Sequence, residues 1–264
     1  MNAWEAALLG VVQGLTEFLP VSSSGHLSLA QRWLGMVPSQ EIAFDVVVHL
    51  GTLLAVCVAF RRPLLEIARE RRGALRPLIL ATLPLVLALP LRRLVERLQD
   101  DPVLLGLAFW VTALVLLLVD WPWRRPPPPE AQPEPSAAPE RLEDVGDRRA
   151  LLVGLAQLCA IFPGISRSGS TISCGLVLGL APALAGELSF LMSIPAVLGA
   201  TAVEARKIGD LAAVDPLPVL VGFVTALVSG LLAIALLRWL LRKRRLWVFS
   251  PWLLAVGALS LLTR

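Results

Sequence analysis

Charge is scarce in this sequence. Only 17% of its 264 residues are charged, whereas 56% are hydrophobic and the mean hydropathy is +0.73. Soluble globular domains carry about 25% charged residues, so this composition excludes an ordinary soluble domain. Apolar runs that approach the roughly 20 residues needed to cross a bilayer as a helix recur along the chain. The sequence therefore predicts an all-α, polytopic membrane protein.

Cysteine is also rare, and a basic N-terminal start is missing. Cys57, Cys159 and Cys174 lie in apolar segments without the spacing of metal ligands, which favours packing over redox or metal roles. Because the N-terminal segment has no basic start, we expect no cleavable signal peptide. The net charge of +4 comes from arginine-rich loops beside the apolar runs. It indicates membrane topology, and we expect no nucleic-acid partner.

Two stretches of the sequence resemble each other at a constant distance of 144 residues. Residues 10–26 read GVVQGLTEFLPVSSSGH, and residues 154–170 read GLAQLCAIFPGISRSGS. The identical pairs are Gly10/Gly154, Gln13/Gln157, Phe18/Phe162, Ser22/Ser166, Ser24/Ser168 and Gly25/Gly169. Each copy has a short apolar helix, a proline break, a Ser/Gly turn that can cap a second helix, and a second short segment. Neither half is long enough to cross a bilayer, so each copy predicts a re-entrant hairpin.

The repeat predicts an inverted topology in which each half has one re-entrant hairpin and three transmembrane helices. An odd number of spans inverts the second half relative to the first. We expect a first repeat over residues 1–121, a proline-rich cytoplasmic linker over 122–149 and a second repeat over 150–264, in a single membrane domain. The expected elements are a hairpin at 1–35, spans at 42–60, 77–91 and 103–121, a hairpin at 150–181, and spans at 186–204, 217–240 and 246–263.

Basic residues and tryptophans indicate how these spans lie in the membrane. Arginine-rich loops at 61–76, 124–149 and 242–245 are expected in the cytoplasm, which places both termini outside. Tryptophans near the expected membrane edges are typical of an interfacial belt. They are Trp4, Trp33, Trp121, Trp123, Trp247 and Trp252.

Arg167 differs from the other basic residues because it lies in the Ser/Gly turn of the second hairpin, which is expected at membrane depth. The two Ser/Gly turns are called the first and second tips. A charge there is costly unless it is paired, and it indicates a functional site; the alternative is a structural ion pair with Glu17. Two half-helix N-termini offer backbone N–H groups to an anion, and the planar guanidinium suits phosphate oxygens. These features predict a diphosphate site. The expected binding residues are Ser22, Ser24, Gly25, Ser166, Ser168, Gly169 and Thr171.

Glu17, Gln13 and His26 add chemistry to the first tip. Glu17 and Gln13 are four residues apart and share one helix face. Glu17 can act as a base or, with the Gln13 amide oxygen, bind Mg²⁺ or Ca²⁺. His26 can relay protons or attack phosphorus, and the alternative is a packed histidine. His49 and Asp45, four apart on one span, are expected to share an internal hydrogen bond, and the alternative is a supporting role behind the site residues.

Both tips resemble the signatures of a known family. Gln13-x-x-x-Glu17, followed by Pro20-Val-Ser-Ser-Ser-Gly-His26, resembles the first signature of the bacterial undecaprenyl-diphosphate phosphatases of the bacitracin-resistance type. Pro163-Gly-Ile-Ser-Arg-Ser-Gly-Ser-Thr171 resembles the second. The resemblance covers most of the chain except about residues 122–149. Gln13 is a departure, because many members have Glu there.

The resemblance implies an integral-membrane phosphatase that hydrolyses undecaprenyl diphosphate to the monophosphate and recycles the lipid carrier for cell-wall synthesis. It implies a site made of Glu17, His26, Arg167 and the serines, with Ser23 as a candidate nucleophile. It also implies the bacterial plasma membrane, with the site facing the outer side. The sequence leaves the nucleophile open between Ser23, His26 and water.

A transporter is the alternative function, because inverted repeats with broken helices are a transporter architecture. Such a protein would move a polyprenyl phosphate across the bilayer. Glu17 together with His26 favours chemistry, since binding an anion requires neither. The sequence also leaves open whether the chain is a monomer or a homodimer.

Overall fold

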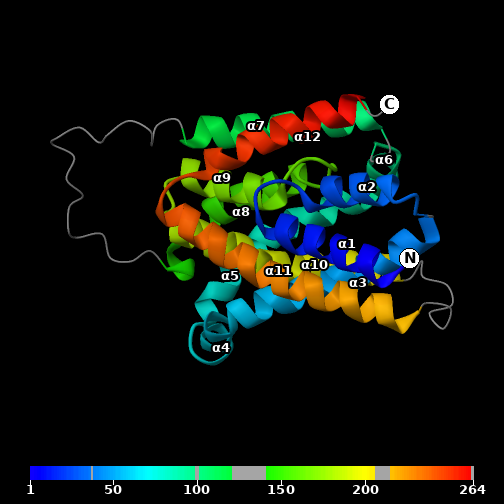
Figure 1. The fold of residues 1–264 in the computed structure, drawn as a ribbon. Coiled ribbons are helices and arrows are strands. Elements are labelled where there is room, and N and C mark those ends of the chain that lie inside the picture. The colour runs from blue at the N-terminus through cyan, green and yellow to red at the C-terminus, as the bar shows by residue number, and fades with distance from the viewer. Residues whose placement is uncertain (37, 99–100, 121–140, 206–214, 263–264) are drawn as a thin grey trace.

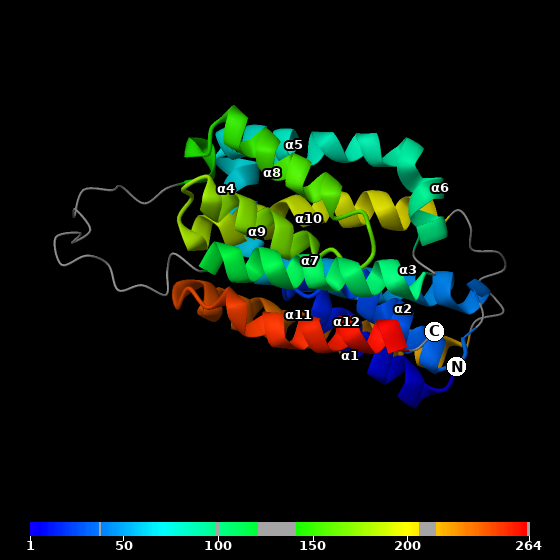
Figure 2. The ribbon, with the colours of Figure 1, turned by 90° about the horizontal axis from the view of Figure 1, so that it is seen from above.

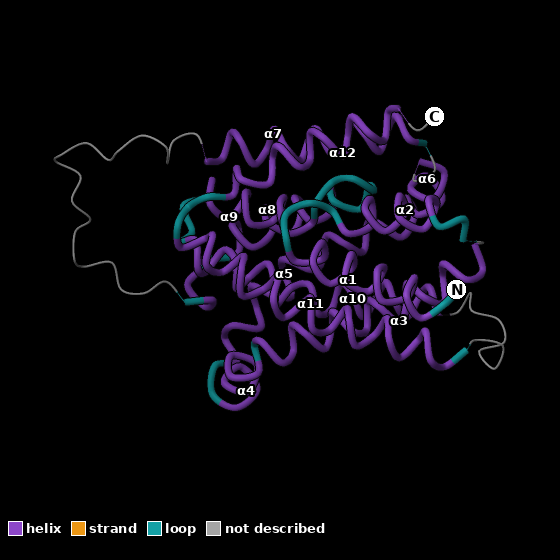
Figure 3. Tube along the Cα trace, viewed as in Figure 1, coloured by secondary structure: helices purple, strands orange, loops and turns teal. Residues whose placement is uncertain are grey.

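The computed structural model describes residues 1–36, 38–98, 101–120, 141–205 and 215–262. These residues form helices and their connecting turns, and no strand occurs among them (Figure 3). Five of the described helical stretches are long and apolar enough to cross a membrane: Ile42–Ala59, Arg72–Leu91, Pro102–Asp120, Pro182–Glu204 and Pro216–Arg242. A further apolar stretch, Leu246–Leu262, is shorter. The expected all-α, polytopic membrane protein is confirmed.

Figure 1 shows the order of the helices along the chain. The first half contains α1 (Ala3–Phe18), α2 (Ser23–Trp33), α3 (Pro38–Ala59), α4 (Arg61–Arg69), η1 (Arg72–Ala74), α5 (Leu75–Thr82), η2 (Leu83–Leu87), α6 (Ala88–Leu98) and α7 (Pro102–Asp120). The second contains η4 (Leu142–Asp144), α8 (Asp147–Cys159), α9 (Arg167–Val177), α10 (Pro182–Ala205), α11 (Pro216–Arg242), η6 (Leu246–Phe249) and α12 (Ser250–Leu262).

Both predicted hairpins form as pairs of short helices. α1 and α2 have 16 and 11 residues, and α8 and α9 have 13 and 11, all below the roughly 20 residues of a transmembrane helix. α1 starts at a capping box in which Asn2 and Glu5 each accept the backbone N–H of the other. Pro20 follows the end of α1, and Pro163 lies between α8 and α9. The turns at these prolines form the two tips.

The predicted span at 77–91 is a broken helical stretch. α5 is followed by the 3₁₀ helix η2 and then by α6, and Pro84 is the second residue of η2. Proline lacks the N–H that the α-helical ladder needs, which explains the change to 3₁₀ geometry. α6 then continues to Leu98, beyond the predicted end of the span.

The predicted linker is described only in its last part, since residues 122–140 lie outside the described residues. The described part is packed against the protein: Leu142 and Val145 are buried. α8 already begins at Asp147, before the expected start of the second repeat at residue 150. Two apolar side chains therefore anchor the end of this segment, which the sequence assigned to a linker.

Basic segments gather at one end of the molecule. α4, η4 and the C-terminal end of α11 lie there, whereas the start of α1 and the end of α12 lie at the opposite end (Figure 1). Arg71 donates two hydrogen bonds to the Glu143 carboxylate, at 2.6 and 3.2 Å, and Arg76 pairs with Asp147. These ion pairs tie the segment after α4 to the start of the second half. The side of the membrane on which this end lies stays a prediction.

The two halves pack against each other through reciprocal helix pairs. α1 packs on α11 and α8 packs on α5, while α3 contacts α10 and α7 contacts α12 (Figure 2). α7 and α12 approach most closely at Gly106 and Gly257, where a Cβ on either glycine would lie 2.7–2.8 Å from the carbonyl oxygen of the other. Small residues allow such close backbone contact between helices in membranes. The indole of Trp110 on α7 also donates to the Leu254 carbonyl oxygen on α12 at 3.1 Å.

Candidate active site

The two hairpin tips touch each other. The Gly164 N–H donates to the Ser22 hydroxyl oxygen at 3.1 Å, and the Ser168 hydroxyl donates to the carbonyl oxygen of Leu19 at 3.1 Å. Each bond joins residues more than 140 positions apart in the chain. The proline breaks therefore bring the two Ser/Gly turns to one place.

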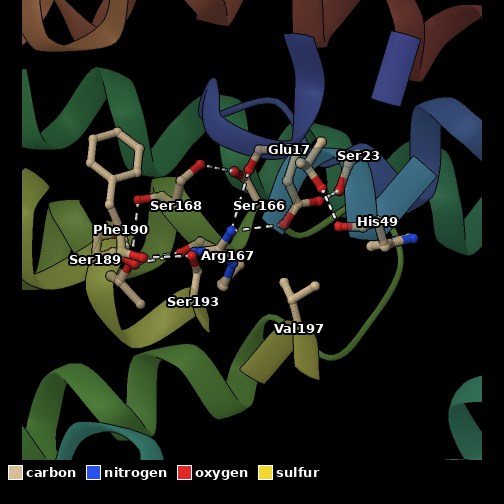
Figure 4. Close-up of polar contacts among 12 residues, drawn as sticks. Glu17, Ser23, His49, Ser166, Arg167, Ser168, Ser189, Phe190, Ser193 and Val197 are labelled. Carbon is tan, nitrogen blue, oxygen red and sulfur yellow. Dashed lines mark hydrogen bonds and ion pairs between the residues drawn. The ribbon is translucent and has the colours of Figure 1, made fainter. Parts of the chain in front are cut away.

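A cavity of about 220 Å³ lies where the tips meet. This volume is well above the roughly 15 Å³ that a single water molecule needs. Its polar wall comes from both hairpins and from α3: Glu17, Ser22, Ser23, Ser24, His49, Gln157, Ser166 and Arg167. Val197 of α10 contributes to an apolar part of the wall (Figure 4).

Glu17 links the catalytic candidates. Arg167 Nη2 lies 2.8 Å from Glu17 Oε1, and the Ser23 hydroxyl donates to Glu17 Oε2 at 2.6 Å (Figure 4). Gln13 Nε2 donates to the same Oε2 at 3.1 Å. The side chains of Glu17 and Arg167 are 6% and 16% exposed, so each charge is shielded from solvent and paired. The structure thus contains the ion pair that the sequence offered as an alternative, and the same carboxylate also holds Ser23.

This arrangement has the geometry of an activated nucleophile. A hydroxyl within hydrogen-bond reach of a base, with the base oriented by a third group, is the common pattern in covalent catalysis. Here the hydroxyl is that of Ser23 and the neighbouring carboxylate is that of Glu17, which Arg167 and Gln13 hold in place.

α10 holds Arg167 through Ser189, which the sequence did not indicate. Arg167 Nη1 donates to the Ser189 carbonyl oxygen at 3.2 Å (Figure 4). The hydroxyl oxygens of Thr171 and Ser189 lie 2.7 Å apart. Serine within an apolar helix has no distinguishing sequence pattern, since it often bonds to its own backbone. Its contact with Arg167 depends on how α9 and α10 pack.

Thr112 of α7 is a second residue that sequence reasoning missed. Its hydroxyl donates to the Gly164 carbonyl oxygen at 3.0 Å and accepts the Ser166 N–H at 3.2 Å. Both groups belong to the turn between α8 and α9, which has no helical partners of its own. Thr112 therefore holds the second tip in shape.

The predicted anion-binding residues separate into two groups. Ser22, Ser24 and Ser166 line the cavity, whereas four others are buried and do not line it: Gly25, Ser168, Gly169 and Thr171. The Gly169 N–H donates to the Ser166 hydroxyl oxygen at 3.0 Å, and the Thr171 hydroxyl donates to the Arg167 carbonyl oxygen at 2.8 Å. The second group shapes the tips through contacts within the protein.

Ser22 does not cap α2 in the expected way. It is the N-cap residue, but its side chain makes no capping hydrogen bond and instead accepts the Gly164 N–H. Its φ of 71° lies in the left-handed region, which is uncommon for serine. The first amides of α2 therefore have no side-chain cap, and they can offer N–H groups to an anion. Ser166, by contrast, caps α9.

His26 lies beside the cavity and does not line its wall. Its Nδ1 lies 2.8 Å from the Ser22 carbonyl oxygen, and its Nε2 accepts the indole N–H of Trp252 at 2.8 Å. The ring is 5.0 Å from that of Phe109, edge to face, and stacks on Trp252 at 6.0 Å. Trp252 was expected as an interfacial residue, and this contact of its indole was not predicted.

His49 lies on the wall of the cavity. Its Nδ1 lies 2.6 Å from the backbone carbonyl oxygen of Asp45, which is the internal hydrogen bond expected from their spacing. The Asp45 carboxylate accepts a hydrogen bond from Gln31 Nε2 at 2.6 Å. His49 thus presents its ring to the cavity while α3 holds one of its nitrogens.

The donor set does not fit a divalent cation held by the protein alone. Among the described residues, no group of three His, Cys, Asp or Glu side chains is close enough to bind one. Both oxygens of Glu17 already accept bonds from Arg167, Ser23 and Gln13. Gln13 Oε1 is buried without a partner, so one neutral oxygen is available beside one carboxylate. Mg²⁺ and Ca²⁺ require six or more oxygen ligands.

The fold and the site define a multi-pass membrane protein with an Arg–Glu–Ser cluster where two helical hairpins meet. Residues 6–259 match the family described as "Bacitracin resistance protein BacA". The chain belongs to this family, which confirms the resemblance of its two motifs.

Curated relatives extend over nearly the whole chain. The undecaprenyl-diphosphatase of Carboxydothermus hydrogenoformans is 40% identical over 269 residues, which cover 99% of this chain and 98% of that protein. The undecaprenyl-diphosphatase of Cupriavidus metallidurans is 38% identical over 99% of this chain and 95% of its own length. That of Methanobrevibacter smithii is 36% identical over 97% and 96%.

Proposed function

We propose that this protein is an undecaprenyl-diphosphatase, which hydrolyses undecaprenyl diphosphate to the monophosphate and inorganic phosphate. The observation that carries the proposal is the Ser23–Glu17–Arg167 cluster on the wall of one cavity, with 2.6 Å between the Ser23 hydroxyl and Glu17. The family and its relatives supply the substrate class. A membrane enzyme with a buried anion site suits a substrate whose tail lies in the bilayer.

Ser23 is the nucleophile in this proposal. Its hydroxyl proton passes to Glu17 as the oxygen bonds to the terminal phosphorus, and the bond from that phosphorus to the bridging oxygen breaks. The lipid monophosphate leaves with the proton from Glu17, and a phosphoserine remains. Water then attacks the phosphorus and gives a proton to Glu17, which passes it to the Ser23 oxygen as the bond from that oxygen to phosphorus breaks, so that phosphate is released and both residues are restored.

Arg167 and the amides of α2 stabilise the charge that develops on the transferred group. The guanidinium has five N–H donors, and those not used by Glu17 and Ser189 are available to phosphoryl oxygens. Phosphoryl transfer depends mainly on such positioning and charge stabilisation. Ser22 leaves the N-terminus of α2 without a side-chain cap, so the first amide N–H groups of this helix are available to the same developing charge.

Phosphate release from undecaprenyl diphosphate by the purified protein in detergent tests the function. Wild type should release phosphate, Ser23→Ala should not, and rapid acid quench should trap a phosphoserine at Ser23. If phosphate is released but the acid quench traps no phosphoserine, the result would instead favour direct attack of water on the phosphorus. An intact diphosphate after incubation would reject the phosphatase and favour the transporter, since transport leaves the diphosphate unchanged.

A divalent cation that arrives with the substrate is part of the proposal. The diphosphate would supply most of its oxygen ligands and Glu17 one more; Gln13 Oε1, which is buried without a partner and does not line the cavity, would join them if its side chain turned toward the cavity. Gln13→Glu adds a second carboxylate beside Glu17 and should lower the cation concentration for half-maximal activity by about tenfold, or 1.4 kcal/mol. The same variant should gain thermal stability on adding Mg²⁺ or Ca²⁺ without substrate. If Gln13→Glu changes neither the cation concentration for half-maximal activity nor the thermal stability with added cation, Gln13 is not part of a cation site.

The inverted repeat and the orientation in the membrane belong to the same proposal. Reciprocal packing of α1 on α11 and of α8 on α5 supports two equivalent halves. The gathering of α4, η4 and the end of α11 at one end supports a common cytoplasmic side for the basic loops (Figure 1). We infer a place in the bacterial plasma membrane, with the cavity reached from the outer side.

A further inference from the structure

The hydrogen bonds of His26 fix its protonation state. An indole N–H can only donate, so Nε2 of His26, at 2.8 Å from Trp252 Nε1, is the acceptor and carries no proton. The neutral ring then has its proton on Nδ1, which donates to the Ser22 carbonyl oxygen at 2.8 Å. Both nitrogens are thus engaged, and the one lone pair that could accept a proton or attack phosphorus points at Trp252.

The same bonds hold an unfavourable backbone conformation. Ser22 has φ 71° and ψ 97°, a conformation that is sparsely populated by residues other than glycine and costs free energy. Its carbonyl oxygen accepts two donors from His26, the ring Nδ1–H and the backbone N–H at 3.2 Å. This turn sends the Ser22 hydroxyl to Gly164 and places the next residue, Ser23, against Glu17.

Packing around the imidazole keeps it in this orientation. Phe109 contacts its edge, and a Cβ on the neighbouring Gly25 would lie 2.6 Å from the Phe109 ring, so α2 is pressed against α7 at this point. The indole ring of Trp252 lies nearly parallel to the imidazole, with 6.0 Å between the ring centroids, and Trp252 is itself 56% exposed. His26 is therefore held between α7 and α12, on the side of the turn away from the cavity wall.

We propose that His26 and Trp252 are positioning residues: Trp252 fixes the tautomer and orientation of His26, and His26 holds the left-handed Ser22 turn that aims the Ser23 hydroxyl. The inference rests on the proposed phosphatase function and assigns His26 no bond to phosphorus and no proton transfer. It adds Trp252, on α12, to the residues on which the site depends.

Substitutions at His26 separate positioning from chemistry. Asn can replace the Nδ1–H donor with its own amide N–H but can neither act as a base near neutral pH nor attack phosphorus, whereas Ala removes the donor. We expect His26→Asn to keep kcat within about tenfold of wild type and His26→Ala to lose about a hundredfold, both with little change in KM. Equal losses in the two variants, with both folded, would overturn the proposal and give His26 a chemical role.

Trp252→Phe tests the second half of the proposal, because Phe keeps a stacked ring without the N–H. We expect kcat to fall about three- to tenfold in the wild-type background. In His26→Asn, whose shorter side chain does not reach the indole, Trp252→Phe should have no further effect, as coupled residues require. Trp110→Phe is the matched control: it removes an indole bond from α7 to the Leu254 carbonyl oxygen on α12 that involves no atom of His26 or Trp252, and it should leave kcat unchanged.

The outcomes distinguish this inference from the function on which it rests. A wild-type protein that releases no phosphate contradicts the proposed function itself. An active wild type with an unchanged kcat in Trp252→Phe, or with additive losses in the double variant, contradicts the positioning pair alone. Detergent-stable folding of each variant is checked by gel filtration and thermal unfolding.

Discussion

Gln157 occupies in the second hairpin the position that Gln13 occupies in the first, but both polar atoms of its amide lack a hydrogen-bond partner among the described residues. Gln13 Nε2 donates to Glu17 Oε2, whereas the residue four positions after Gln157 is Ile161. Gln157 is 2% exposed and lines the cavity. The two hairpins therefore share their framework, and the carboxylate is present in only one of them.

Gln157→Met should stabilise the substrate-free protein. Removing a buried amide without partners relieves a penalty of about 1–3 kcal/mol, and Met fills a similar volume. The matched variant Gln13→Met should destabilise it, because that side chain gives up its bond to Glu17. Thermal unfolding in detergent compares the two. A drop in stability of Gln157→Met would mean that its amide has a partner such as an ordered water.

Arg167→Lys should lose about a hundredfold or more in kcat while the protein still folds. Lysine keeps the charge, but its ammonium cannot present the planar set of donors that contacts Glu17 and the Ser189 carbonyl and still faces a phosphoryl group. Phosphate release and gel filtration are measured together. Turnover near the wild-type value would exclude Arg167 from the catalytic set.

Glu17→Gln should abolish activity and also destabilise the protein by about 3–5 kcal/mol, because it leaves the buried Arg167 charge unpaired. Combining it with Arg167→Leu removes both charges. The double variant should therefore recover most of the stability and none of the activity. If Glu17→Gln alone unfolds at the wild-type temperature, water reaches Arg167 well enough to replace the ion pair.

The Arg71–Glu143 pair predicts a pH dependence at the basic end of the molecule. The hydrogen bond from Arg71 holds the pKa of Glu143 below its usual value. The pair therefore stabilises the folded state above the ordinary pKa of a glutamate, about 4.3, and this stabilisation is lost as the pH falls through the lowered folded-state pKa. Glu143→Gln should cost about 0.5–1 kcal/mol at pH 7. The difference in thermal unfolding from wild type should shrink in acid, with phosphatase activity unchanged at pH 7.

Single cysteines in a background without the native ones test the orientation. Trp4→Cys, near the start of α1, should react with a membrane-impermeant reagent in intact cells. Arg69→Cys, at the end of α4, should react only after permeabilisation, since both residues are exposed at opposite ends of the molecule (Figure 1). The reverse pattern would invert the proposed topology.

The sequence predicted the parts of the site that lie on one local pattern. Proline breaks and the repeated Ser/Gly turns located both tips, and a charge at membrane depth singled out Arg167. Thr112, Ser189 and Trp252 could not be predicted, because each acts through packing between helices distant in the chain. The same limit applies to Ser168 and Thr171, which carry hydroxyls as Ser166 does but, unlike Ser166, do not line the cavity.

The close packing of α7 on α12 has a consequence for the order of events in biosynthesis. Trp252 reaches His26 from α12, which packs on α7 at Gly106 and Gly257 and is synthesised after the helices that carry Ser23, Glu17 and Arg167. A nascent chain in the membrane would already hold these three residues, yet its nucleophile would lack the support of Trp252. Until α12 has packed on α7, turnover should therefore stay about three- to tenfold below its full value, as in Trp252→Phe.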